Sequence, residues 1–361
     1  MNDANELISF IASMSGEGNL RVEENLGEGY VRLRVSEAER RQAKHDIQHV
    51  EDIVIEMLRN ARDAGADKVY LATTKEDGVR TLVFLDNGSG VPQDMQERIF
   101  DARVTSKLES MKIDRWGVHG RGMALFSIKQ NTDEARVVAS DVDLGSVFKV
   151  SVATDRLGER ADQSSWPQAV KDEDGHYVCA RGPHNIIRAA CEFALEELRA
   201  CDVYLGSPSE IAATLHAQAS SRLDASRLLF IDDEAELPVV DRLGLASDAE
   251  DFIRICSGLG LEMSERTAHR ILAGQIKPVR GVTARLLRER DSSSHAPAPV
   301  DLAKDRRGLR IAKDDMAQFS RAVERDFNDL ASRYYLNLCG DPKIRVSRDR
   351  ITVTFDLAKE E

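Results

Sequence analysis

The sequence lacks the features of a membrane-spanning or disulfide-stabilised protein. No stretch approaches the roughly 18 consecutive apolar residues that a bilayer-spanning helix requires, and no signal peptide opens the chain. Cysteine is scarce, and the five cysteines are scattered without a C-x-x-C pair, which disfavours a disulfide framework and a zinc site. We therefore expect a cytoplasmic protein with reduced, mostly buried thiols and no membrane partner.

Positive charge is also in deficit. The chain has 62 acidic residues against 50 Lys plus Arg, for a net charge of −12. This balance argues against a protein that coats nucleic acid with its whole surface, although it leaves room for a local basic patch. At 361 residues the chain exceeds a typical single core, so two or three domains are expected.

The stretch from Ile55 to Leu125 holds the residues with the clearest chemistry. Its first part is expected to be a helix, on which Glu56 and Asn60 share a face and Asp63 follows one turn later. A carboxamide oxygen can ligate magnesium, and a neighbouring carboxylate can hold a water aimed at a phosphate. Taken alone, the same spacing is more often an ordinary solvated helix face.

Two glycine-containing segments follow. A short apolar strand at 81–85 runs into DNGSG, where Asp86 can accept a hydrogen bond from an exocyclic amine while Gly88 and Gly90 let a flat base approach. A hairpin turn is the alternative interpretation of Asn-Gly. Further on, GVHGRG precedes an apolar helix, an arrangement that lets backbone amides wrap phosphates.

In this order the motifs resemble the nucleotide-binding fold of gyrase, the heat-shock chaperones, the histidine kinases and MutL, which form the GHKL superfamily. The resemblance covers roughly 35–155, and its details are similar to MutL and the topoisomerase VI B subunit. The matching segments are ExxxNARDA at 56–64, DNGSG at 86–90, TSK at 105–107 and GVHGRG at 117–122. No GxxxxGK[ST] loop occurs. The resemblance implies a Bergerat-type α/β sandwich within an α+β chain, with helices on one face of a mixed sheet.

The resemblance also implies residue roles. Glu56 would be the general base, Asn60 the magnesium ligand and Asp86 the contact to the adenine amine. Gly88 and Gly90 would shape the base pocket, and Lys107 would lie in the lid. The other candidate nucleotide contacts are Asp63, Thr105, Ser106, Gly117, His119, Gly120, Arg121, Gly122 and Met123. The last motif lacks the repeated GLGL of many histidine kinases, and Arg121 is expected either on a phosphate or exposed on the lid.

The first domain is expected to span 1–155, with an N-terminal arm that in dimeric relatives crosses to a partner, so a homodimer is implied. Ser36 and Glu39 have capping-box spacing for one long helix that carries His45 and His49. A histidine kinase needs a separate two-helix hairpin of about 60 residues for its phosphorylated histidine, and no such hairpin fits before Glu56. The segment 101–116 is expected to be a polar lid.

Two further segments are expected on either side of a basic segment at 246–291. Residues 156–245 read as a linker followed by a second α/β unit of the transducer type. The only lysine between 156 and 276 is Lys171, so either a lysine acting in trans on the γ-phosphate is absent or the transducer analogy fails. Residues 292–361 are expected to form a linker, a long amphipathic helix and a β-hairpin. The apolar stripe of that helix fits either a core or a dimer contact.

The segment 246–291 is the basic part of the chain. Seven basic residues stand against three acidic ones between 262 and 290, within what we expect to be three short helices. Such a module suits a helix-turn-helix in contact with DNA, and a helical hairpin packed on the second unit is the alternative. The candidate DNA contacts are Arg266, Thr267, Arg270, Lys277 and Arg280.

The sequence therefore predicts a magnesium-dependent ATP-binding protein, an ATPase whose lid closure and dimerisation act as a gate or clamp on DNA. A protein kinase of the histidine-kinase or anti-sigma-factor type, or a chaperone-like signalling ATPase, remains the alternative.

Overall fold

The computed structural model divides into two compact units, 1–291 and 292–361. No helix among the described residues is both long and apolar enough to cross a bilayer. The described residues are 22–106, 112–114, 117–119, 122–160, 162–198, 200–223, 233–287, 316, 319–320, 323–324, 327, 336–340, 342–346 and 351–359.

A five-stranded mixed sheet forms the centre of the first unit, in the order β12-β3-β4-β9-β8. The pair β12 and β3 is parallel, and the other neighbours are antiparallel. The strands are β3 (Lys68–Glu76), β4 (Val79–Asp86), β8 (Glu134–Ser140), β9 (Ser146–Ala153) and β12 (Asp202–Gly206). We expected 156–245 to form a separate unit, but its strand β12 completes the sheet of the nucleotide-binding motifs. Residues 224–232 of this segment lie outside the described residues.

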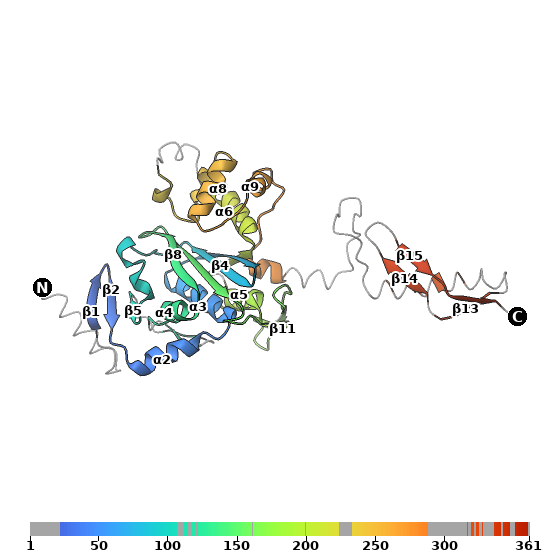
Figure 1. Ribbon diagram of the computed structural model, residues 1–361, viewed down its shortest axis with the longest axis horizontal. Coiled ribbons are helices and arrows are strands. Elements are labelled where there is room, and N and C mark those ends of the chain that lie inside the picture. The colour runs from blue at the N-terminus through green and yellow to red at the C-terminus, as the bar shows by residue number, and fades with distance from the viewer. Residues whose placement is uncertain are drawn as a thin grey trace. The chain divides into compact units, whose positions relative to one another are not determined.

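Helices cover both faces of this sheet (Figure 1). The helices are α2 (Glu37–Asp46), α3 (Val50–Asp63), α4 (Ala124–Asn131), α5 (Ile186–Glu196), α6 (Pro208–Arg222), α8 (Ala249–Gly258) and α9 (Glu265–Leu272), with 3-10 turns η3 (Glu234–Glu236) and η4 (Arg242–Leu245). Alternate strand residues explain the two layers, because successive side chains point to opposite faces. Leu82 and Phe84 pack against α3, α4 and α5, whereas Val83 and Leu85 pack against α6, α8 and α9.

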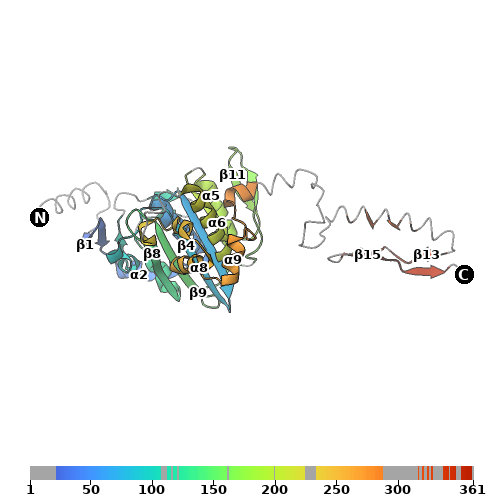
Figure 2. The ribbon, with the colours of Figure 1, turned by 90° about the horizontal axis from the view of Figure 1, so that it is seen from above.

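This arrangement corrects the expectation of helices on one face only. The basic segment packs its apolar side on the sheet through residues such as Phe252, Ile255 and Ile271. In the perpendicular view α8 and α9 cross the strands (Figure 2). Residues 282–287 form a further helical turn, whose Val282 and Leu286 join the core of the opposite face.

The long helix expected from 37 to 64 is two helices. Ser36 and Glu39 form the expected capping box of α2. The chain then turns extended at Ile47, which is buried in the core, and α3 begins after His49. The Asp52 side chain accepts hydrogen bonds from the amides of Gln48 (2.9 Å) and His49 (2.8 Å), so a second N-terminal cap forms where continued helix was expected.

Smaller elements surround this core. β1 (Val22–Gly27), β2 (Tyr30–Leu33) and β5 (Val104–Thr105) form a three-stranded sheet, and β6 (Lys112–Asp114) pairs with β7 (Gly117–His119). The segment after Pro92 forms two 3-10 turns, η1 (Gln93–Met95) and η2 (Arg98–Phe100). The expected linker at 156–184 contains a hairpin of β10 (Gln168–Lys171) and β11 (Tyr177–Arg181).

In the second unit, β14 (Lys343–Val346) pairs antiparallel with β15 (Ile351–Thr354), and β13 (Leu336–Leu338) pairs with β16 (Leu357–Lys359). Its described helical positions include Met316, Phe319, Val323 and Phe327, and the Phe327 ring stacks on Phe355. Leu330 and the linker at 291–300 lie outside the described residues.

Candidate functional site

A cavity of about 500 Å³ lies on the face of the sheet that α3 and α4 cover. This volume is within the range of roughly 300–1,000 Å³ that is typical of small-molecule sites. The cavity brings together most of the candidate residues, although they come from four separate segments. Those that line it are Glu56, Asn60, Asp63, Asp86, Gly90, Thr105, Ser106, Gly122 and Met123.

One face of α3 supplies the first group. Spacings of four and three residues place Glu56, Asn60 and Asp63 toward the cavity, while Val54 and Leu58 are fully buried in the core beneath. The Asp63 side chain is 4% exposed and accepts a hydrogen bond from Arg62 at 3.1 Å. Helical periodicity therefore places these three side chains on one wall of the cavity.

Asp86 enters from the end of β4. It is 4% exposed, lies opposite Ser146 of β9, and accepts a hydrogen bond from the Gly88 amide at 2.9 Å. Ser146 also lines the cavity. Sequence analysis missed this serine, because only the register between β4 and β9, which are distant in sequence, brings it beside the aspartate.

The glycines around Asp86 allow close approaches to different parts of the backbone. A Cβ on Gly88 would meet the Ala64 carbonyl oxygen at 2.8 Å, so this glycine lets the loop pack on the end of α3 and does not line the cavity. Gly90 lines the cavity with a φ of +72°, and its Cβ would lie 1.8 Å from the Asp141 oxygen. Gly145, which sequence analysis also missed, has a φ of +78°. A Cβ at this position would lie 2.2 Å from the backbone carbonyl oxygen of Asp86.

The last group comes from the segments on either side of the expected lid. Thr105 ends β5, and Gly122 and Met123 precede α4. A Cβ on Gly122 would lie 2.8 Å from the Val104 oxygen, which ties the end of the glycine-rich loop to β5. Lys107, Gly120 and Arg121 lie outside the described residues, and for Gly117 and His119 the structure describes only the strand β7.

Two buried arginines that the motifs did not single out also line the cavity. Arg59 is 2% exposed and donates a hydrogen bond to the Glu56 carboxylate at 2.7 Å. The spacing of three helical positions from Glu56 was the available sequence signal. Arg103 is 7% exposed and donates to Glu39 of α2. No local pattern pointed to Arg103.

The N-terminal hairpin and α2 contribute further cavity residues. Tyr30 of β2 and Glu39 of α2 both line it. Burial raises the pKa of the Tyr30 phenol more than its hydrogen bond with Ser106 lowers it. Burial alone would raise the pKa of the Glu39 carboxyl, but hydrogen bonds from Ser36 and Arg103 outweigh it, so this pKa lies below its ordinary value.

The cavity is acidic. Its described lining holds two guanidinium groups, those of Arg59 and Arg103. The five carboxyl groups of the lining belong to Glu39, Asp46, Glu56, Asp63 and Asp86. An anionic ligand therefore needs additional cations, because like charges repel strongly in a partly buried site. Within the described ranges, no three His, Cys, Asp or Glu residues lie close enough together to hold a metal by themselves.

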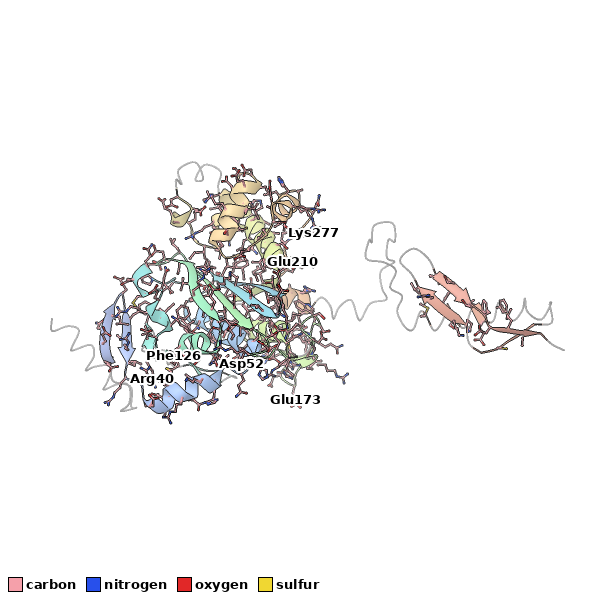
Figure 3. The ribbon with its side chains drawn as sticks, in the orientation of Figure 1. Arg40, Asp52, Phe126, Glu173, Glu210 and Lys277 are labelled. Carbon is pink, nitrogen blue, oxygen red and sulfur yellow. The ribbon has the colours of Figure 1, made fainter. Side chains whose placement is uncertain are left out.

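The candidate DNA residues lie apart from this cavity, on the helical layer of the other sheet face. Arg266, Arg270, Lys277 and Arg280 are exposed, and Thr267 is half-buried. Lys277 stands at the outer edge of this layer in Figure 3. The neighbouring acids are engaged elsewhere, since Glu262 pairs with Lys149 at 3.0 Å and Glu265 lies 3.7 Å from His269.

Comparisons with known proteins match the part of the chain that builds the cavity. The family model of the histidine kinase-, DNA gyrase B-, and HSP90-like ATPases matches residues 47–140. The DNA mismatch repair protein MutL of Staphylococcus aureus, in strains Newman, JH1 and Mu3 / ATCC 700698, is 29% identical over 136 residues. The match covers 35% of this chain but only 20% of MutL, so the chain corresponds to about a fifth of that relative.

The family match contains the α3 face, Asp86 and Gly122, and the domain is thus of the ATP-binding ATPase type. The matched part of the chain, residues 47–140, is a GHKL-type ATPase domain with similarity to MutL.

Proposed function

We propose that this protein binds ATP with magnesium in the cavity on α3 and hydrolyses it, and that lid closure and dimerisation make the cycle a gate or clamp. The observation that carries the proposal is the convergence of Glu56, Asn60 and Asp86 on one cavity from two separate elements. The resemblance assigns these three residues to one nucleotide. A cavity that holds all three supports that assignment.

Asp86 is the proposed adenine contact. Its buried carboxylate is an acceptor for the exocyclic amine, and a buried acceptor of this kind gives strong selectivity for a matching donor. Gly90 leaves the adjacent wall without a side chain, so a planar base can approach the backbone.

Asn60 is the proposed magnesium ligand. Its carboxamide oxygen is a hard donor of the kind that magnesium prefers, and magnesium in phosphoryl-transfer sites is commonly held by few protein groups together with substrate phosphates and water. When bound, the ion would neutralise charge on the phosphates.

Glu56 is the proposed general base. It faces the cavity one helical turn before Asn60, and its partly exposed carboxylate is available to orient a water toward the γ-phosphate. Arg59 holds one of its oxygens, which fixes the side chain.

The test is ATP hydrolysis and nucleotide affinity measured separately on the full chain. Glu56→Gln should lower kcat by about 10²- to 10⁴-fold, the usual contribution of a general base, and leave ATP affinity within a few-fold. Asp86→Asn should instead weaken ATP binding by roughly tenfold or more. Undiminished turnover in Glu56→Gln would reject the base assignment. Transfer of labelled phosphate to a protein would favour a kinase.

We further propose DNA as the partner of the exposed cations on and after α9. Arg266 and Arg270 are exposed and have no ion pair within the described part of the chain. Arg254 of α8 offers a matched control, because it is exposed but already paired with Glu234 at 2.6 Å.

Replacing Arg266 and Arg270 together with alanine should reduce the salt dependence of DNA binding by about one unit of log–log slope per lost phosphate contact. The Arg254→Ala slope should match that of the wild type. Equal slopes in all three proteins would remove these residues from the DNA interface.

A further inference from the structure

Arg103 occupies a constrained position beside the glycine-rich loop. Its backbone has a φ of +63°, a conformation that non-glycine residues seldom adopt. Its amide donates to the Gly122 oxygen at 2.8 Å, and its carbonyl accepts from the Leu33 amide at 2.9 Å. The backbone is thereby fixed between β2 and the end of the loop that precedes α4.

The guanidinium of Arg103 is buried but not fully satisfied. Its side chain is 9% exposed and lines the cavity, and one terminal nitrogen donates to Glu39. The Nε atom is buried and has no hydrogen-bond acceptor among the described residues. Leaving a buried donor without an acceptor costs free energy, and the cost is larger when the group is charged. An acceptor that enters with a ligand would remove this cost.

Glu39 fixes the guanidinium without neutralising the whole group. One Glu39 carboxylate oxygen accepts a hydrogen bond from the Arg103 guanidinium. The other accepts a hydrogen bond from the Ser36 amide at 2.8 Å and so caps α2. The carboxylate is therefore shared between a helix cap and the arginine. Arg103 lines the cavity and its Nε atom lacks an acceptor among the described residues, whereas Arg59, the other described guanidinium of the lining, donates to Glu56.

We propose that Arg103 is a phosphate-binding residue of the nucleotide site, acting in cis from the segment just before Thr105 and Ser106. The inference rests on the proposed ATP binding and adds to it a residue outside the motifs. Arginine suits this role, since its planar fork forms charge-assisted hydrogen bonds to phosphate oxygens. Its contact with the Gly122 carbonyl places it next to the loop proposed to cradle the phosphates.

The experiment compares affinities for adenosine and for a non-hydrolysable ATP analogue with magnesium, using the full chain. Arg103→Met should weaken binding of the analogue by about tenfold or more and change adenosine binding by less than about twofold. Arg103→Lys keeps the charge but loses the fork, so it should lose less analogue affinity than Arg103→Met. If Arg103→Met does not fold, the inference is tested by whether Arg103→Lys weakens analogue binding while adenosine binding stays unchanged.

Glu39→Gln separates phosphate binding from a purely structural role. It removes the ion pair with Arg103 and one negative charge, so the analogue should bind more tightly. A loss of analogue affinity equal to that of Arg103→Met would show that the ion pair matters only for the fold, and would overturn the inference. An unchanged ratio of analogue to adenosine affinity in both Arg103 variants would do the same. A wild-type chain that binds neither compound would overturn the proposed function as well.

Discussion

The two faces of the central sheet bury different kinds of side chain. Toward α3, α4 and α5 the protein buries charge, including Arg59 and Asp86, and holds the 500 Å³ cavity. Toward α6, α8 and α9 the core is aliphatic and aromatic, and none of the buried charged residues of the described ranges lies on these three helices. Burying charge is costly unless it is paired. Apolar contacts therefore stabilise the sheet on both faces, and among the described residues the α3 side also buries paired charge around the cavity.

The largest expected effect tests the apolar face. Phe252 of α8 is fully buried and meets His216 edge to face, with ring centroids 5.5 Å apart. Phe252→Ala should lower the free energy of unfolding by about 3–5 kcal/mol, the usual cost of such a cavity. Chemical denaturation would measure this loss. Nucleotide affinity of the folded protein should stay within about twofold, and a parallel fall in affinity would mean that the two faces are not independent.

The next effect tests the cavity face. Gly90→Ala introduces a Cβ 1.8 Å from the Asp141 carbonyl oxygen, so the loop after Asp86 must move and ATP affinity should fall by roughly tenfold. Gly78→Ala is the matched control, because Gly78 has a similar φ of +79° but nothing lies within 4 Å of the position that its new methyl group would take. Both variants should lose about 1–2 kcal/mol of stability from the left-handed backbone. Only Gly90→Ala should lose nucleotide affinity, as measured by titration.

The smallest expected effect tests how the buried charge of Arg59 contributes to catalysis. The Arg59 guanidinium donates a hydrogen bond to the Glu56 carboxylate at 2.7 Å, and a general base acts only when it is held in position. With Arg59→Gln the carboxylate loses this contact, so kcat for ATP hydrolysis should fall by about three- to fivefold. Arg188→Gln is the control, since Arg188 is also buried and pairs with Glu192 within α5, away from the cavity. Equal kcat values for the two variants would argue against any action of Arg59 on Glu56.

The sequence predicted those parts of the site that depend on local spacing. Glu56, Asn60 and Asp63 follow helical periodicity, and Asp86 follows a short apolar strand, so their placement on one cavity agrees with a local pattern. Ser146 could not be found in this way, because it meets the site only through pairing between β4 and β9. The position of Arg103 at the cavity could not be predicted for a related reason, because its backbone conformation depends on contacts with β2 and the glycine-rich loop.

The fold was predictable to a similar extent. Most strands and helices of the first unit follow their hydrophobic periodicity, but the partners of each element depend on contacts across the chain. The break between α2 and α3 arises because Ile47 joins the core and Asp52 caps a new helix, and a helix-favouring sequence does not reveal either contact. The sequence likewise predicts the basic helices as a separate module, because their packing on the sheet depends on apolar residues distant in the chain.

The parallel pairing of β12 with β3 has a practical consequence for anyone who isolates the nucleotide-binding part. A fragment that stops near residue 155 would leave β3 as an outer strand, with the backbone of Val69 and Leu71 unpaired on one side. Unprotected apolar strand edges invite intermolecular pairing and precipitation. The smallest soluble piece should therefore extend at least through Gly206, well beyond the end of the family match at 140.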